Sequence, residues 1–290
     1  MKAAIIVDST AGLSKEVTDN PNVFQIFLST IFEDGTVYVD TPNEKLTQEF
    51  YDRREQESVL PKSSQPEPQQ AYDVFERILA EGYDTVFGLF LSSKISGTYQ
   101  TVHSVSQEFT DRLSIHLIDS ELTSFVMEGI TKNLLTLTQK DLSSEDILSK
   151  IDSALKQSAF YFMPATLDNL VKGGRLSCFS GMIGNLLSIK PLITISHESN
   201  GEVIVSEKVR SMKKALNRLY TLACEHIEQY PDNAYITVGH TGAPKDAELL
   251  RDQLLVTYPE ASIRIGFITP VLGTHGGTGA VSINIAPLEK

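Results

Sequence analysis

The sequence is poor in cysteine and in basic residues, and both shortages narrow what the protein can be. Its two cysteines, Cys178 and Cys224, lie far apart and show no metal-ligand spacing. We therefore expect neither a disulfide framework nor a zinc site, and so few thiols fit a reducing cytoplasm. The 25 basic residues are outnumbered by 37 acidic ones, for a formal net charge of -12. A field of that sign repels phosphate backbones and anionic lipid surfaces, which argues against nucleic acid and membrane partners.

Long apolar runs are also missing. The longest uncharged stretch, residues 176–189, has about 14 residues, and a helix needs roughly 20 to span a bilayer. The apolar run at residues 3–7 turns polar at once and is too short for the core of a signal peptide. The sequence thus predicts no stable membrane insertion and a cytoplasmic location.

Three motifs that would name an activity are absent. The chain contains no G-x-G-x-x-G, no G-x-x-x-x-G-K-[ST] and no G-x-S-x-G. A dinucleotide fold, a phosphate loop and a nucleophile elbow are therefore unsupported. The six histidines show no metal spacing, so we expect no metal and no cofactor.

Strand and helix patterns alternate through the first half of the 290 residues. Such alternation predicts a parallel sheet covered by helices on both faces. A hairpin turn is indicated at Asp34-Gly35. The predicted strands are residues 3–7, 23–28, 85–91 and 115–118, and the predicted helices are residues 67–81, 98–108, 123–138 and 144–157.

The second half has a different rhythm, with a hairpin indicated around Ser199-Asn200-Gly201. We therefore predict an α/β protein of two domains, residues 1–157 with a parallel sheet and residues 158–290 with a mixed sheet. The boundary rests on the change of pattern alone. The predicted strands are residues 160–163, 192–196, 202–205, 235–238, 263–267 and 281–285, and the predicted helices include residues 211–230 and 247–258.

Hydroxyl-rich segments follow the predicted strands, at the edge where α/β sheets bind ligands. They are residues 8–10, 92–98 and 119–120, and a further polar loop spans residues 62–66. Hydroxyls and helix-start amides can hold an anion without a cation, which suits one weakly charged oxygen group better than a triphosphate. Each serine alone could instead be a helix N-cap, and only their clustering favours a site.

His275 and Arg175 are the most distinctive side chains outside those segments. His275 lies in a glycine-rich loop, residues 273–279, where the backbone can approach a ligand closely. It could instead be a turn histidine bound to a carbonyl, and Arg175 could be satisfied by carbonyls or acidic side chains. Residues 176–189, which contain Gly181 and Gly184, predict either a core helix or the wall of an acyl tunnel.

Five segments in this order resemble the DegV family, the fatty-acid-binding subunits of bacterial fatty acid kinase. The resemblance covers nearly the whole chain. Two details differ: the family usually has Thr at the position of Ser63, and Gly-Pro-Gly where this chain has Gly277-Thr278-Gly279. The five segments are Asp8-Ser9-Thr10, Ser63-Ser64-Gln65-Pro66, residues 92–99, Lys172-Gly173-Gly174-Arg175-Leu176-Ser177 and Gly273-Thr274-His275.

The resemblance implies one long-chain fatty acid buried between the two domains as the ligand. It implies that Ser63, Ser93 and His275 hold the carboxylate, with Ser92, Ser96, Gly97 and Arg175 as neighbours. It also implies a separate ATP-dependent kinase subunit as partner, which converts the carboxylate to an acyl phosphate. The chain itself would then be a carrier and not an enzyme.

Two readings from other classes stay open at this point. One is an enzyme acting alone, either a hydrolase that uses a serine of residues 92–93 with His275 or a relative of dihydroxyacetone kinase. The other is a scaffold without a ligand. The sequence does not specify the acyl chain, the oligomeric state or the surface that meets a kinase.

Overall fold

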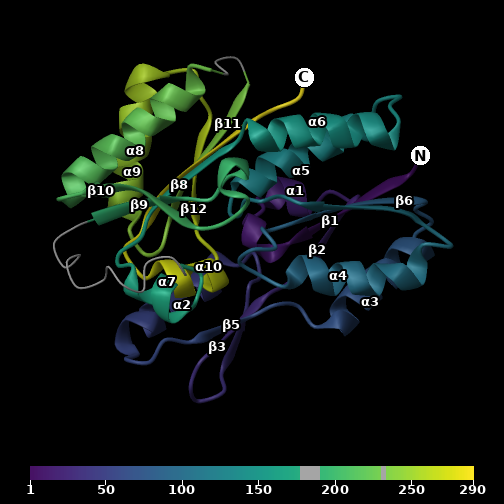
Figure 1. Cartoon of the computed structure of the whole chain (residues 1–290), viewed down its shortest axis with the longest axis horizontal. Coiled ribbons are helices and arrows are strands. Elements are labelled where there is room, and N and C mark those ends of the chain that lie inside the picture. The colour runs from purple at the N-terminus through teal and green to yellow at the C-terminus, as the bar shows by residue number, and fades with distance from the viewer. Residues whose placement is uncertain (177–189, 230–232) are drawn as a thin grey trace.

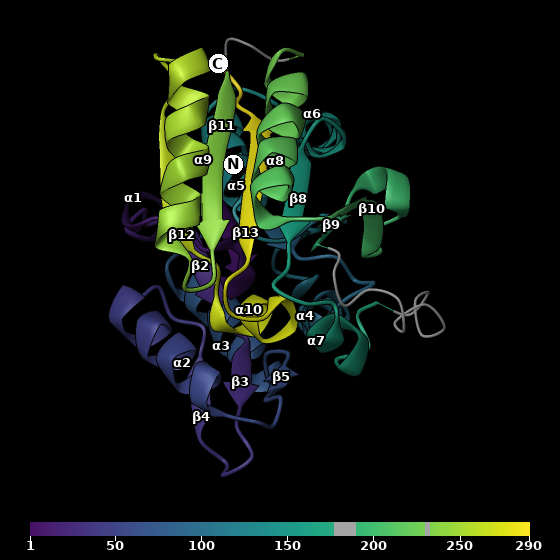
Figure 2. The same ribbon diagram turned by 90° about the vertical axis from the view of Figure 1, so that its left-hand side faces the viewer.

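The first half of the chain builds a parallel sheet in the order β2-β1-β6-β7. A computed structural model describes residues 1–176, 190–229 and 233–290, and Figures 1 and 2 show it from two sides. Every residue of β1 is buried, as expected of an apolar run covered on both faces. The strands are β1 (Ala3–Asp8), β2 (Val23–Ile26), β6 (Thr85–Phe90) and β7 (Ser114–Asp119).

Helices cover both faces of this sheet (Figure 1). The α3 helix starts with a proline in its first turn, and Gly82 follows it with a positive φ of 76°, the usual start and end signals. The α6 helix is capped by Ser143, whose side chain accepts from the Asp146 N–H. The two pairs of helices are α3 (Pro68–Ala80) with α4 (Thr98–Ser106), and α5 (Val126–Leu137) with α6 (Ser144–Lys156).

A small antiparallel sheet, in the order β4-β3-β5, lies apart from the parallel one. The predicted Asp34-Gly35 turn is confirmed, because it joins β3 to β4 and Gly35 has a φ of 84°. A helix packs beside this sheet through Phe50, which meets the rings of Phe32 and Tyr38. These elements are β3 (Ser29–Ile31), β4 (Val37–Val39), β5 (Lys62–Ser64) and α2 (Glu44–Gln56).

The second half builds a mixed sheet in the order β10-β9-β8-β13-β11-β12. All neighbours are antiparallel except β11 and β12, which are parallel. The α8 and α9 helices lie side by side on its outer face (Figure 2). The elements are β8 (Ala159–Met163), β9 (Lys190–Thr194), β10 (Ile204–Val209), β11 (Ala234–His240), β12 (Ile263–Phe267), β13 (Val281–Pro287), α8 (Met212–Ile227) and α9 (Pro244–Thr257).

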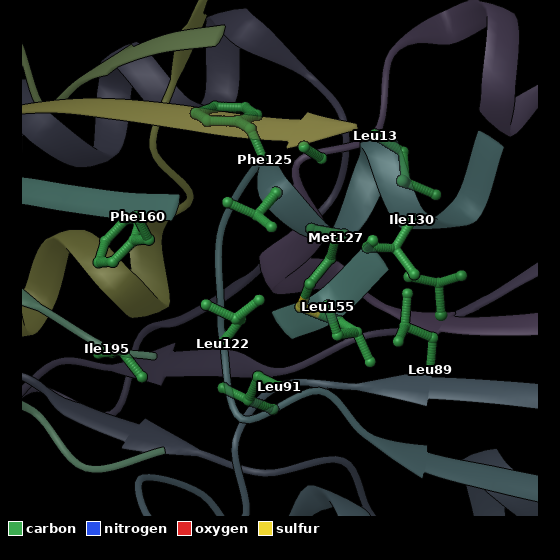
Figure 3. Close-up of a cluster of buried hydrophobic side chains, with 14 of the residues drawn as sticks. Leu13, Leu89, Leu91, Leu122, Phe125, Met127, Ile130, Leu155, Phe160 and Ile195 are labelled. Carbon is green, nitrogen blue, oxygen red and sulfur yellow. The ribbon is translucent and has the colours of Figure 1, made fainter. Parts of the chain in front are cut away.

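The predicted fold class is confirmed, and one apolar core joins its two sheets. Helix α5 supplies Phe125, Met127 and Ile130 to this core, and it meets Phe160 of β8 and Leu89 of β6 there (Figure 3). Gly129 permits the contact, because a Cβ at that position would lie 2.7 Å from the Cβ of Ala286 on β13. Helix α5 is therefore packed between the sheets. The six-stranded sheet begins at Ala159, and the boundary at residue 157 stays a prediction.

Three local expectations were wrong. Helix α2 was not predicted, and residues 62–64 form strand β5 where a loop was expected. The glycine-rich segment of residues 273–279 was expected to be a loop, but its first four residues belong to helix α10 (Pro270–Gly276); Gly277 and Gly279 follow the helix with positive φ values of 77° and 89°. The structure also contains two short helices, α1 (Lys15–Thr18) and α7 (Asp168–Lys172). The apolar helix expected over residues 176–189 lies, apart from Leu176, outside the described residues.

Candidate functional site

A cavity of about 340 Å³ lies between the parallel sheet, the mixed sheet and helix α10. Its volume falls in the range of small-molecule sites. The walls are mainly aliphatic and aromatic side chains drawn from both halves of the chain. These are Leu28, Leu91, Ile95, Phe160, Phe162, Leu170, Ile193, Ile195, Val203, Ile268, Val271 and Leu272.

The polar side chains of the cavity begin with Ser63 and His275. The Ser63 Oγ lies 2.9 Å from Nε2 of His275. Ser63 pairs with Thr30 across β5 and β3, and the Thr30 hydroxyl lies 3.4 Å from that of Thr274. The small sheet therefore sets both residues of the pair, because it carries Ser63 and contacts the helix that carries His275.

His275 is held as a neutral ring. Burial, and then the positive charge of Arg175, lower the pKa of His275 to about 4. Its Nδ1 is buried with no hydrogen-bond partner in the described residues. Gly173 is packed against this ring edge, since a Cβ on Gly173 would collide with Nδ1. The ring can thus offer one proton or one lone pair to a ligand near neutral pH, but no charge.

Arg175 brings the positive charge to this cluster. Its Nε donates to the carbonyl of Ile95 at 3.1 Å, and its Nη1 donates to the carbonyl of Gly173 at 2.7 Å. No carboxylate in the described part of the chain forms an ion pair with it, although the chain is acidic overall. The guanidinium is therefore oriented by carbonyls while its charge stays unbalanced, which favours an anionic ligand.

Ser96 and Gly97 line the cavity from the loop before α4. The Ser96 hydroxyl lies 2.9 Å from that of Thr98. Gly97 precedes the helix, and a Cβ there would collide with the side chain of Gln65. The loop of residues 62–66 and the loop of residues 92–98 are thus packed against each other at the cavity.

Ser92 and Ser93 do not line the cavity. The Ser92 Oγ is buried and donates to the carbonyl of Gly201 at 2.8 Å, and the Ser93 N–H donates to Asp119 at 3.1 Å. Of the predicted site residues, the cavity therefore brings together Ser63, Ser96, Gly97, Arg175 and His275.

Sequence reasoning missed several polar residues of the lining. Gln65 and Ser64 belong to a segment that had been singled out, but no role was assigned to them. Thr123 and Ser124 precede α5, and Ser124 has a positive φ of 67°. Nothing in their local pattern separates them from helix-capping residues, so no sequence signal could have found them.

A serine hydrolase needs a third group to orient the histidine. The structure supplies a serine–histidine contact through Ser63, not through Ser92 or Ser93. The other ring nitrogen of His275 has no partner among the described side chains and backbone groups. A triad is therefore not assembled in the described residues.

The described residues show neither a metal site nor a helix that could cross a membrane. No cluster of His, Cys, Asp and Glu suitable for a metal occurs in residues 1–176, 190–229 and 233–290. Within the same residues, no helix combines the length and apolar character needed to cross a membrane.

Comparison with known proteins agrees with this picture. A DegV domain-containing protein of Listeria innocua is 34% identical over 283 residues, covering 97% of each chain. The solved structure described as a fatty acid binding DegV family protein from Streptococcus agalactiae has 32% identity and a TM-score of 0.90, over 100% of both chains. DegV of Bacillus subtilis, described as a fatty acid binding protein, has 29% identity and a TM-score of 0.86, over 99% of both chains.

The model of the uncharacterised DegV family matches residues 2–288. With a match of that length and relatives above 30% identity, the chain belongs to the DegV family.

Proposed function

We propose that this protein binds one long-chain fatty acid in the cavity between its sheets. The observation that carries this proposal is an apolar cavity lined by Arg175, a positive charge with no carboxylate partner among the described residues. A single anionic head on a long apolar tail matches that combination. The related proteins from S. agalactiae and B. subtilis, described as fatty acid binding, support it.

The tail supplies most of the binding free energy in this account. Burying a methylene group gains about 0.8 kcal/mol, so a sixteen-carbon tail could contribute roughly 10 kcal/mol before the cost of ordering it. The polar residues would then orient the acid and select its carboxylate, rather than provide the bulk of the affinity.

We assign the carboxylate to Ser63, Ser96, His275 and Arg175. Arg175 balances the charge, and the two hydroxyls donate hydrogen bonds. The neutral His275 ring can donate its Nε2–H to the carboxylate or to Ser63, whose Oγ lies 2.9 Å away. Gly97 lets the loop of residues 92–98 approach Gln65. Ser92 and Ser93, which the resemblance also implied, belong to this loop but lie outside the cavity lining, and we assign them a role in supporting its shape.

Alanine variants test this assignment. We expect Ser96→Ala to weaken the binding of palmitate to delipidated protein by about tenfold, the loss of roughly one charged hydrogen bond. Ser93→Ala is the matched control, because its hydroxyl belongs to the same loop but not to the cavity lining, and we expect a change of less than about twofold. Equal effects in the two variants would remove Ser96 from the site.

We further propose that the bound carboxylate is presented to a separate ATP-dependent kinase subunit, which forms an acyl phosphate. The support is the family resemblance and the lack of a phosphate-loop motif in the sequence. The isolated chain should therefore consume no ATP with or without palmitate, as measured by ADP release. ATP turnover by the isolated chain would contradict the carrier role, and acyl phosphate formed only after a kinase subunit is added would support it.

A further inference from the structure

Two buried carboxylates, Asp8 and Asp40, lie behind the wall of the cavity. Asp8 ends strand β1 and Asp40 follows strand β4, and they are 0% and 2% exposed. Ser9 lies between them, and its Oγ is 3.4 Å from Oδ2 of Asp40. Within the described residues neither carboxylate has an ion-pair partner; the nearby Arg264 pairs with Glu128.

These groups hold the backbone of three residues that line the cavity. The N–H of Leu91 donates to Asp8 at 2.7 Å, and the N–H of Val271 donates to Asp40 at 3.0 Å. The N–H of Leu28 donates to the Ser9 hydroxyl at 3.0 Å. Asp8 and the hydrogen-bonded pair Ser9–Asp40 thus reach the parallel sheet, the chain before β3 and helix α10.

The Asp40 contact also fixes the start of the helix that carries His275. Tyr51 donates to the carbonyl of Ile268, just before α10, at 2.6 Å. Farther along, Thr274 and His275 meet the small sheet. The segment from β3 to β5 therefore contacts α10 from its first turn to its last, and Asp40 is its acidic contact.

An amide at position 40 could still accept from Val271 and could donate to Ser9, reversing the bond that Ser9 now donates to Asp40, without burying a charge. A carboxyl group is needed at this position only if the uptake and release of its proton have a role. Burial raises the pKa of Asp40 to about 7, with a further contribution from the charge of Asp8, and burial raises the pKa of Asp8 to about 6. Both groups therefore exchange protons near neutral pH.

We propose that Asp40, together with Asp8, is a proton-coupled positioning group of the fatty-acid site. An anionic ligand that fills the cavity adds negative charge and removes water beside the pair, and both effects favour its protonated form. Binding is then linked to proton uptake, and affinity falls as the pH rises through neutrality. This inference rests on the proposed binding of a fatty acid.

Other titratable groups lie on α2, β11 and α10, and charged residues line a second cavity with Asp40. Burial, followed by the charge of Asp40, raises the pKa of Tyr51 on α2 well above 10. Burial lowers the pKa values of His240 on β11 and His275 on α10 to about 4. These three groups keep their protonation state between pH 6 and 8. The charged residues that line a second cavity with Asp40 are Lys15, Asp19, Glu44 and Arg264.

The test compares palmitate binding to delipidated wild-type protein and to Asp40→Asn at pH 6 and pH 8. The wild-type dissociation constant should rise about fivefold or more between the two, a typical coupling. Asp40→Asn mimics the protonated state, so it should keep the tighter affinity at both values. Asp34→Asn is the matched control, an exposed carboxylate in the neighbouring hairpin that bonds Thr36 and Arg53, and should behave as the wild type.

Asp40→Leu separates positioning from charge, because it removes the acceptor of Val271 and the partner of Ser9. Palmitate should bind more weakly at both pH values, while Asp40→Asn rescues it. If Asp40→Leu fails to fold, the pH response of Asp40→Asn decides alone. The same pH response in Asp40→Asn as in the wild type would overturn the inference while leaving the proposed function intact; no palmitate binding by the wild type would overturn both.

Discussion

A single arginine supplies the positive charge that makes the cavity selective for an acid. Two nitrogens of Arg175 donate hydrogen bonds to the carbonyls of Ile95 and Gly173. These bonds fix the plane of the guanidinium, as a lysine could not do. The protein is acidic overall, but no carboxylate in the described residues pairs with Arg175. The positive charge of Arg175 is therefore available to the ligand.

Substitutions of Arg175 test the importance of its charge and shape. Arg175→Ala should weaken palmitate binding by about 10- to 100-fold, which corresponds to the loss of a hydrogen bond to a charged group. Arg175→Lys should fall between the wild type and the alanine variant, since it keeps charge without the fork. Lys172→Ala, an exposed cation in the same region, is the control. If Lys172→Ala and Arg175→Ala had equal effects, the interaction would be long-range and not a contact in the site.

At the scale of single residues, the sequence predicted much of the polar lining. Ser63, Ser96, Gly97, Arg175 and His275 all line the cavity, although their roles toward a ligand stay predictions. What it could not predict is which serine of a consecutive group faces the cavity. Ser92 turns toward Gly201 instead, a contact with a residue more than a hundred positions away that no local pattern encodes.

Helix α10 shows why glycine was misleading at the scale of elements. Gly273 and Gly276 suggested a flexible loop, but neither has a positive φ. A Cβ on Gly273 would collide with the ring of Tyr51 on α2, and one on Gly276 would collide with Phe162 on β8. These glycines allow the helix to pack closely against neighbours that come from distant parts of the sequence. Tertiary contacts therefore outweigh the poor helix propensity of glycine here.

The second prediction concerns the packing of α7 against α10. Gly173→Ala should displace the His275 ring, because the added methyl group would overlap Nδ1. Gly173 has a φ of -76°, which alanine can adopt, but its Cβ would also lie 2.9 Å from the carbonyl oxygen of Asn169. We expect palmitate affinity to fall about tenfold and the free energy of unfolding to fall by about 1–3 kcal/mol, the usual cost of overpacking. An unchanged affinity, measured by titration calorimetry, would show that the ring position is not critical.

For the whole molecule, alternating patterns were sufficient to predict a parallel sheet and a mixed sheet, whereas a ligand between the two domains was implied by the family resemblance and stays a prediction. They could not predict the small sheet as a separate unit, because β3, β4 and β5 have three residues each. Strands that short carry no clear period, and their pairing depends on the chain closing around α10.

The third prediction is a pH dependence of the free energy of unfolding. Burial raises the pKa values of Asp8 and Asp40 and lowers those of His240 and His275. A raised carboxyl pKa contributes stability below its unfolded value that is lost as pH rises; a lowered histidine pKa contributes stability that is lost as pH falls. Between about pH 4 and 6 the two pairs oppose each other, so these four groups should leave stability nearly flat.

Asp40→Asn removes one of the two carboxyl groups whose pKa values are raised. Relative to the wild type, its free energy of unfolding should rise with pH by up to about 1.4 kcal/mol per pH unit between pH 4 and 7. Urea unfolding at several pH values, followed by circular dichroism, measures the difference, with Asp34→Asn as the exposed control. Parallel curves for Asp40→Asn and the wild type would mean that Asp40 is not buried as a shifted carboxyl.

The central claim is that one fatty acid occupies the cavity between the sheets, and native mass spectrometry of the purified protein tests it most directly. We expect one bound fatty acid per chain, released as a free acid on denaturation. Arg175→Ala should carry less bound fatty acid than the wild type. A ligand without a carboxyl group, or a wild-type protein that stays empty after incubation with palmitate, would contradict it.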